Sequence, residues 1–213
     1  MEEEDDRRYK LEDYLNYRDL LNSSMEHADQ RGRMFYNDSY VHAAMVVESI
    51  IRLATQEKRH IKMYCGEFSI FRDNFCKKIH KLKEEIEPHD NPSLHDAWAE
   101  FDPYRDLKKA LEDYFNIEEA MFQLIVEKDI QSLKEETVWD IVESAMKNNR
   151  LSVERIIEPS GLCHFIVSGN SYRKESSDKE KTAICCFDDN VTAQILQSNF
   201  DTLKRKTEKC FSF

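Results

Sequence analysis

The chain alternates short strand-like segments with helical segments, and this alternation constrains its fold more than any other feature. Strands are predicted where apolar residues alternate with polar ones, or form short runs between turn residues. The segments that fit are 60–65, 122–127, 151–157, 163–167, 171–175 and 182–187. Amphipathic helical segments separate the first three, as in α/β units. We therefore predict an α/β domain with a mixed sheet of about five or six strands and helices on both faces.

Capping residues and apolar stripes divide the chain further. Asn37-Asp38-Ser39 is a helix N-cap cluster, and Asp102-Pro103 is a cap followed by proline at the first helical position. We predict an N-terminal helical extension over residues 1–37 and one domain over 38–213. Prolines and an Asp-Asn pair predict a turn-rich loop excursion at 88–102. The last apolar stripe predicts a helix that runs to the C-terminus.

The N-terminal extension is rich in tyrosine and leucine on more than one side, which suggests more contact than one core provides. It can pack on its own domain or form an oligomer or partner contact, since tyrosine is enriched at interfaces. The candidate interface residues are Tyr9, Tyr14, Leu15, Tyr17 and Leu21.

The composition favours a folded and strongly acidic protein. Apolar residues make up 40% of the chain, enough for a core, and the net charge is −11. Direct binding to nucleic acid needs clustered Lys and Arg, so we do not expect it. The acidic start, Met1–Asp6, and the absence of a membrane-length apolar run predict a cytoplasmic protein.

The six cysteines do not have the spacing of a zinc site. Cys185 and Cys186 are adjacent on a predicted strand, so their side chains should face opposite sides of the sheet. We interpret the cysteines as reduced thiols and predict neither a metal nor a cofactor.

The segment from His164 onward resembles part of a phospholipase D-like half-domain. A histidine opens a strand, and a hairpin, another strand and a closing helix follow. The resemblance covers roughly residues 38–213. The family's signature is His-x-Lys-x(4)-Asp, and here Ile166 replaces the lysine and Ser171 replaces the aspartate. In that family two such sites pair across a two-fold axis, and the resemblance implies that His164 would attack phosphorus.

The candidate pocket gathers charged residues at predicted strand ends, where open α/β sheets bind ligands. Its members are Glu67, Glu127, Asp129, His164 and Arg173. The acids can line a pocket, bind magnesium or simply be solvated. Arg173 and Lys174 lie on the strand next to His164, and either could substitute for the missing lysine.

Without that lysine, the charge that develops on a phosphoryl group has no fixed cation. We therefore predict a non-catalytic accessory or interaction subunit of a larger intracellular assembly, working with protein partners or as a homodimer. Degenerate half-domains of this kind resemble components of bacterial nucleic-acid-processing and antiphage defence complexes. Two alternatives stay open: a phosphodiesterase or nuclease that uses His164 at a dimer interface, and a small-ligand sensor.

Overall fold

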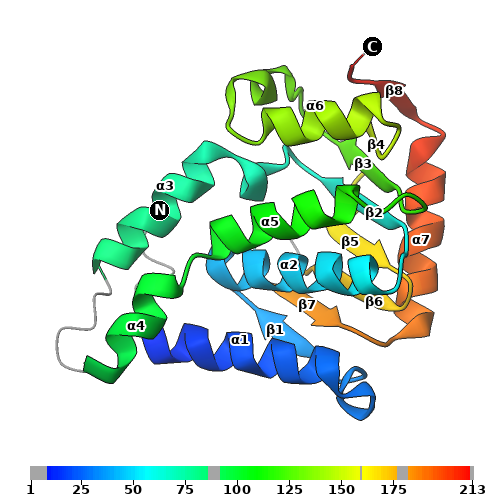
Figure 1. The fold of residues 1–213 in the computed structure, drawn as a ribbon. Helices are drawn as coiled ribbons and strands as arrows, with labels where there is room; N and C mark the ends of the chain where they lie inside the picture. Colours follow the sequence, from blue (N-terminus) through cyan, green and yellow to red (C-terminus); the bar gives the residue numbers. More distant parts are fainter. Residues whose placement is uncertain (1–8, 86–91, 159, 177–181, 212–213) are drawn as a thin grey trace.

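The protein was studied as a computed structural model, which describes residues 9–85, 92–158, 160–176 and 182–211. Within these ranges the strands form one eight-stranded sheet, in the order β1-β7-β6-β5-β2-β3-β4-β8 (Figure 1). The strands are β1 (Phe35–Asn37), β2 (Ile61–Cys65), β3 (Phe122–Val126), β4 (Leu151–Ile156), β5 (Phe165–Ser168), β6 (Ser171–Glu175), β7 (Ala183–Cys186) and β8 (Thr207–Lys209).

The sheet is mixed, as predicted. β2, β3 and β4 are parallel neighbours, and every other pairing is antiparallel. All six predicted strands are present. The two that the sequence did not indicate, β1 and β8, are three-residue strands at the two edges of the sheet.

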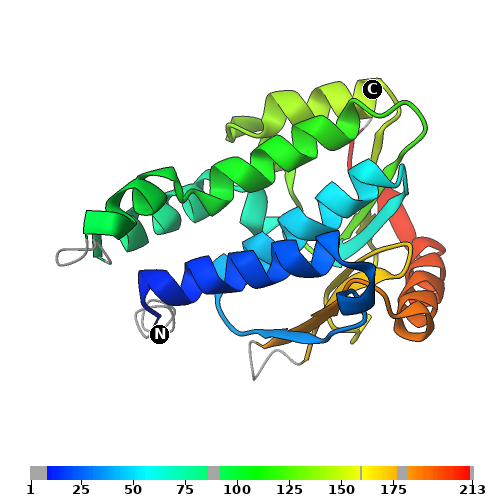
Figure 2. The ribbon, with the colours of Figure 1, turned by 60° about the horizontal axis from the view of Figure 1, so that its bottom comes forward.

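Helices cover both faces, which confirms the predicted fold class (Figure 2). The α-helices are α1 (Leu11–Glu26), α2 (Tyr40–Gln56), α3 (Asp73–Glu85), α4 (Pro92–Glu100), α5 (Pro103–Phe115), α6 (Trp139–Lys147) and α7 (Asn190–Lys204). Short 3₁₀ helices are η1 (Ala28–Gln30), η2 (Ser69–Phe71) and η3 (Gln131–Glu135). The predicted N-caps are observed: Ser39 accepts from His42 N–H, and Asp102 accepts from Arg105 N–H.

Alternation along the strands divides the core in two. Met63, Leu124 and Ile166 face the larger core, which includes buried residues of α1, α2, α3, α5 and α6. Their strand neighbours Ile125 and Phe165 face the smaller core, which is closed by α7. In Figure 2, α1, α2 and α5 lie together on one side of the sheet and α7 lies on the other.

The predicted N-terminal extension over 1–37 is helical in α1, but it is not helical throughout its described part. Helix α1 ends at Glu26, and residues 35–37 form β1, which pairs antiparallel with β7. The segment therefore belongs to the sheet and to the larger core. The sequence around β1 does not indicate a strand, because the residues that pair with it lie far along the chain, in β7.

Two further predictions need correction. Residues 92–100 of the expected loop excursion form α4, whose Trp98 is buried and stacks on Phe101. The final helix does not reach the C-terminus, because it ends at Lys204 and β8 then pairs with β4. Among the described residues, no helix combines the length and apolarity that crossing a membrane requires.

Candidate functional site

A cavity of about 450 Å³ lies where β2 and β3 end, between the first turn of α2 and strands β5 and β6. It is named the His164 cavity below. Charged side chains from six segments line it: Asp38, Glu67, Lys78, Glu127, Lys128, His164, Arg173 and Glu175. Apolar residues such as Met63 and Ile166 complete the wall.

The structure brings together four of the five residues of the predicted pocket. Glu67, Glu127, His164 and Arg173 all line the His164 cavity. Asp129 is exposed, and its carboxylate accepts the backbone N–H of Gln131 at 2.8 Å, so it belongs to the turn that leads into η3. Sequence reasoning missed Glu175 and Tyr64, which contact the predicted residues directly.

His164 lies between two carboxylates. Its Nδ1 is 3.1 Å from Oε2 of Glu175, and its Nε2 is 3.4 Å from Oε2 of Glu127. Ionised carboxylates only accept hydrogen bonds, so a ring that satisfies both must carry a proton on each nitrogen. The hydrogen bond with Glu175 raises the pKa of His164 against the opposing effect of burial, and Glu127 adds to the rise. The geometry therefore favours the imidazolium form.

Glu175 joins the histidine to an arginine. Arg173 donates from its terminal nitrogen to Glu175 at 3.1 Å and from Nε to Asn37 Oδ1 at 3.0 Å. Burial alone would raise the pKa of Glu175, but His164 and Arg173 outweigh it and hold that pKa below its ordinary value. The strand register explains this contact, since residues 173 and 175 lie on the same face of β6.

Tyr64 closes the other side of the network. Its hydroxyl donates to Glu127 and lies 2.6 Å from Oγ of Ser160. Its ring meets the imidazole of His164 edge-on, with centroids 5.5 Å apart. Burial, together with the bond to Glu127, raises the pKa of Tyr64 to about 12, so the hydroxyl remains a donor. Glu127 is thus held by Tyr64 as well as by His164.

Each described basic side chain that lines the His164 cavity already has a partner. Arg173 is held by Glu175 and Asn37, and Lys128 pairs with Glu67 at 3.5 Å. The ammonium of Lys78 lies 6.0 Å from the ring centroid of Tyr40. A phosphoryl group entering this cavity would meet carboxylates and would have to compete for every cation.

The candidate interface residues lie inside the chain's own core. Tyr14, Leu15 and Leu21 are buried, while Tyr9 and Tyr17 are partly buried. The three tyrosine rings surround the imidazole of His42 on α2, with centroid distances of 4.8, 5.3 and 4.2 Å. The extra contact surface that the sequence suggested is therefore α2 of the same chain.

The cysteines are all free thiols. Cys185 and Cys186 face opposite cores, as the strand pattern predicts, and burial raises the pKa of both. In the described part of the chain no three His, Cys, Asp or Glu residues are grouped so that they could hold a metal ion.

No family model and no curated protein matches the chain. Among solved structures it is similar to TrmBL2, an archaeal chromatin protein whose structure shows a mode of DNA binding, with a TM-score of 0.49, 9% identity and 83% of the chain covered. The match spans about half of TrmBL2, 54%. The chain is also similar to Nuc from Salmonella typhimurium, a phospholipase D family member, with a TM-score of 0.46 and 12% identity, covering 83% of this chain and 95% of Nuc. At these values the likeness is one of architecture and assigns no activity.

Proposed function

We propose that this protein is a non-catalytic interaction subunit. In this proposal His164 forms ion pairs with Glu127 and Glu175 and does not attack a substrate. The observation that carries the proposal is the position of His164 between Glu127 and Glu175, each within ion-pair distance of one ring nitrogen. A nucleophilic histidine needs a lone pair on the attacking nitrogen, and an imidazolium has none. The raised pKa of His164 favours that unreactive form.

The electrostatics of the cavity support the same conclusion. Phosphoryl transfer needs donors aimed at the charge that develops in the transition state, and one missing donor costs about 3 kcal/mol. Ile166, at the cavity wall, has no charge, and Arg173 on the neighbouring strand is committed to Glu175. Glu67 and Glu127 would also repel a phosphodiester.

A role in binding other proteins fits the exposed apolar residues. Tyr36 on the edge strand β1 is 70% exposed, and Val191 and Ile195 on α7 are also exposed. An edge strand carries unpaired backbone groups that can accept a strand from a partner. We propose a protein partner or a second copy of this chain, within a larger assembly.

The phosphodiesterase reading remains the second candidate, because Glu175 orients Nδ1 of His164 and the His164 cavity offers about 450 Å³ beside the ring. Hydrolysis of a nitrophenyl phosphodiester and cleavage of plasmid DNA, each measured with and without magnesium, distinguish the phosphodiesterase from the non-catalytic subunit. We expect no turnover from the wild type or from His164→Ala.

His95→Ala is the matched control, because His95 is an exposed histidine on α4. Cleavage that survives in His95→Ala and disappears in His164→Ala would overturn the proposal and make the chain an enzyme. For the binding role, light scattering and recovery of partners from cells should show a complex that Tyr36→Asp weakens. A monomer without partners would contradict that role.

A further inference from the structure

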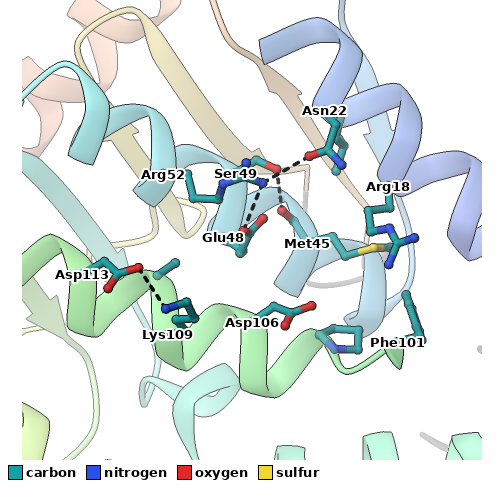
Figure 3. A pocket seen from close by; sticks show the side chains of 13 residues that line it. Arg18, Asn22, Met45, Glu48, Ser49, Arg52, Phe101, Asp106, Lys109 and Asp113 are labelled. Atoms are coloured by element: carbon teal, nitrogen blue, oxygen red, sulfur yellow. Dashed lines mark hydrogen bonds and ion pairs between the residues drawn. The ribbon is translucent and has the colours of Figure 1, made fainter. Parts of the chain in front are cut away.

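A second cavity, of about 270 Å³, lies between α1, α2 and α5 (Figure 3). It is named the Glu48 cavity below. Apolar side chains form part of its wall: Leu21, Met45, Phe101 and Ala110. Its volume is near the lower end of small-molecule sites, which are typically about 300–1,000 Å³. Such sites combine apolar side chains with polar groups in fixed positions, and here six of the thirteen wall residues are charged.

The basic residues at this cavity already have partners. Lys109 pairs with Asp113 on the same helix at 3.7 Å. Arg52 lies 3.2 Å from Oδ1 of Asn22 and 3.4 Å from the carboxylate of Glu48. The guanidinium of Arg18 lies over the ring of Phe101, 6.0 Å from its centroid.

Two carboxylates at this cavity each have one arginine as ion-pair partner. Figure 3 shows Glu48 on α2 and Asp106 on α5 pointing into the central part of the cavity from opposite sides. The side chain of Glu48 is only 17% exposed, and one arginine is its ion-pair partner. Asp106 pairs with Arg105, which is not part of the cavity wall.

We propose that the Glu48 cavity binds a small organic cation, a primary amine or a guanidine with an apolar body, whose charge lies between Glu48 and Asp106. The apolar body would contact Met45 and Leu21. A metal ion fits less well, since Mg²⁺ and Ca²⁺ prefer six or more oxygen ligands, and no three His, Cys, Asp or Glu residues in the described part of the chain are grouped to hold a metal ion. This proposal is independent of the role assigned to His164.

The protonation of Glu48 supports a cationic ligand. Burial raises the pKa of Glu48 to about 7, Arg52 opposes the rise, and Asp106 adds to it. A bound cation would favour the ionised carboxylate in the same way that Arg52 does. The other charged groups facing this site are Arg18 on α1 and Lys109 and Asp113 on α5.

The test is calorimetric titration of the full chain with phenethylamine and with its neutral isostere phenethyl alcohol, at pH 8. We expect the amine to bind at least tenfold more tightly, a difference of about 1.4 kcal/mol. Glu48→Gln should remove this preference and Asp106→Asn should weaken it, whereas Glu112→Gln, an exposed change on α5, should keep it. Equal affinities for amine and alcohol, absent binding of the amine, or a preference that survives Glu48→Gln would overturn the proposal.

The affinity for phenethylamine, measured as a function of pH, is a second test of the same site. With a pKa of about 7 for Glu48, the ionised fraction rises about tenfold between pH 6 and pH 8. The affinity for phenethylamine should rise about as much over that range. In Asp106→Asn, residual binding should keep this pH dependence, and in Glu48→Gln it should be lost. A flat profile in the wild type would contradict the role of Glu48.

Discussion

The His164 cavity and the Glu48 cavity each contain a half-buried or buried titratable group with a raised pKa, yet the two shifts have opposite meanings. For His164 the rise favours the charged form, because carboxylates lie at both ring nitrogens. For Glu48 the rise favours the neutral form, because burial removes water and Arg52 compensates only in part. His164 has a carboxylate at each ring nitrogen, whereas buried Glu48 has a single arginine as its ion-pair partner.

This difference separates a structural network from a binding site. Opposite charges that already contact one another stabilise the fold and leave little for a ligand to gain. A carboxylate that is disfavoured in its charged form gains from any cation that reaches it. The His164 cavity has more charged residues in its wall, yet it is the weaker candidate for chemistry. The Glu48 cavity is the better candidate for binding a ligand.

The largest expected effect tests whether α1 is part of the framework of the Glu48 cavity. Tyr14 is fully buried and stacks against Phe101, which lines that cavity. Tyr14→Ala should lower the free energy of unfolding by about 4 kcal/mol through cavity formation, measured by urea denaturation. Tyr36→Ala is the control, because Tyr36 is 70% exposed and should change stability by only about 0.5 kcal/mol. Similar small effects for both variants would show that α1 is a dispensable extension.

The second prediction concerns the pH dependence that Glu48 imposes. Its pKa in the folded state is about 7, above the ordinary value of 4.5, so the folded chain binds more protons between these values. Wild-type stability therefore falls as pH rises through this window. Relative to wild type, Glu48→Gln should gain up to about 3 kcal/mol between pH 5 and pH 8. Urea denaturation at both pH values measures the difference; a constant offset, as expected for Glu112→Gln, would contradict the assignment.

A smaller effect is expected from opening the His164 network. Glu175→Gln removes the charge that His164 and Arg173 share and should cost about 2 kcal/mol near pH 6. The lowered pKa of Glu175 makes its contribution fade as pH falls below about 4.5. The raised pKa of His164 makes its contribution fade as pH rises above about 6.5, through the folded-state value.

Denaturation of Glu175→Gln between pH 4 and pH 9 should therefore show the greatest loss in the middle of the range. Glu67→Gln is the control, since Glu67 is 46% exposed in a single ion pair and should cost about 0.5 kcal/mol or less. Equal costs for the two variants would mean that the network contributes no more than a surface pair.

The central strands were predictable because local pattern and tertiary environment agree there. Buried segments such as 122–126 are apolar on both faces, as strands covered by helices on both sides must be. The edge strands β1 and β8 were not predictable. Three residues are too few to show an alternation of apolar and polar side chains, and each strand forms by pairing with a distant segment, β7 or β4. Helix α4 was not predicted because it begins at Pro92. Proline is tolerated in the first turn of a helix, but it is also common in loops.

The candidate site was predictable where strand ends converge, and this rule placed Glu67, Glu127 and His164 at one cavity. The role of Glu175 was also accessible, because it lies two residues after Arg173 on the same strand face. Tyr64 was not, since alternation points it toward the opposite core and only its hydroxyl reaches Glu127. Glu48 has a sequence signal of its own, because it is the one acidic residue of Tyr40–Gln56, a helix that is buried on most sides.

The most direct test of the account is a nitrogen NMR titration of the ring of His164, assigned by comparison with His164→Gln. We predict that the pKa of the ring lies above its ordinary value of about 6.5 and that both ring nitrogens carry protons below that pKa. That pKa should fall in Glu175→Gln. A pKa at or below the ordinary value would contradict the closed network and leave the histidine available as a nucleophile.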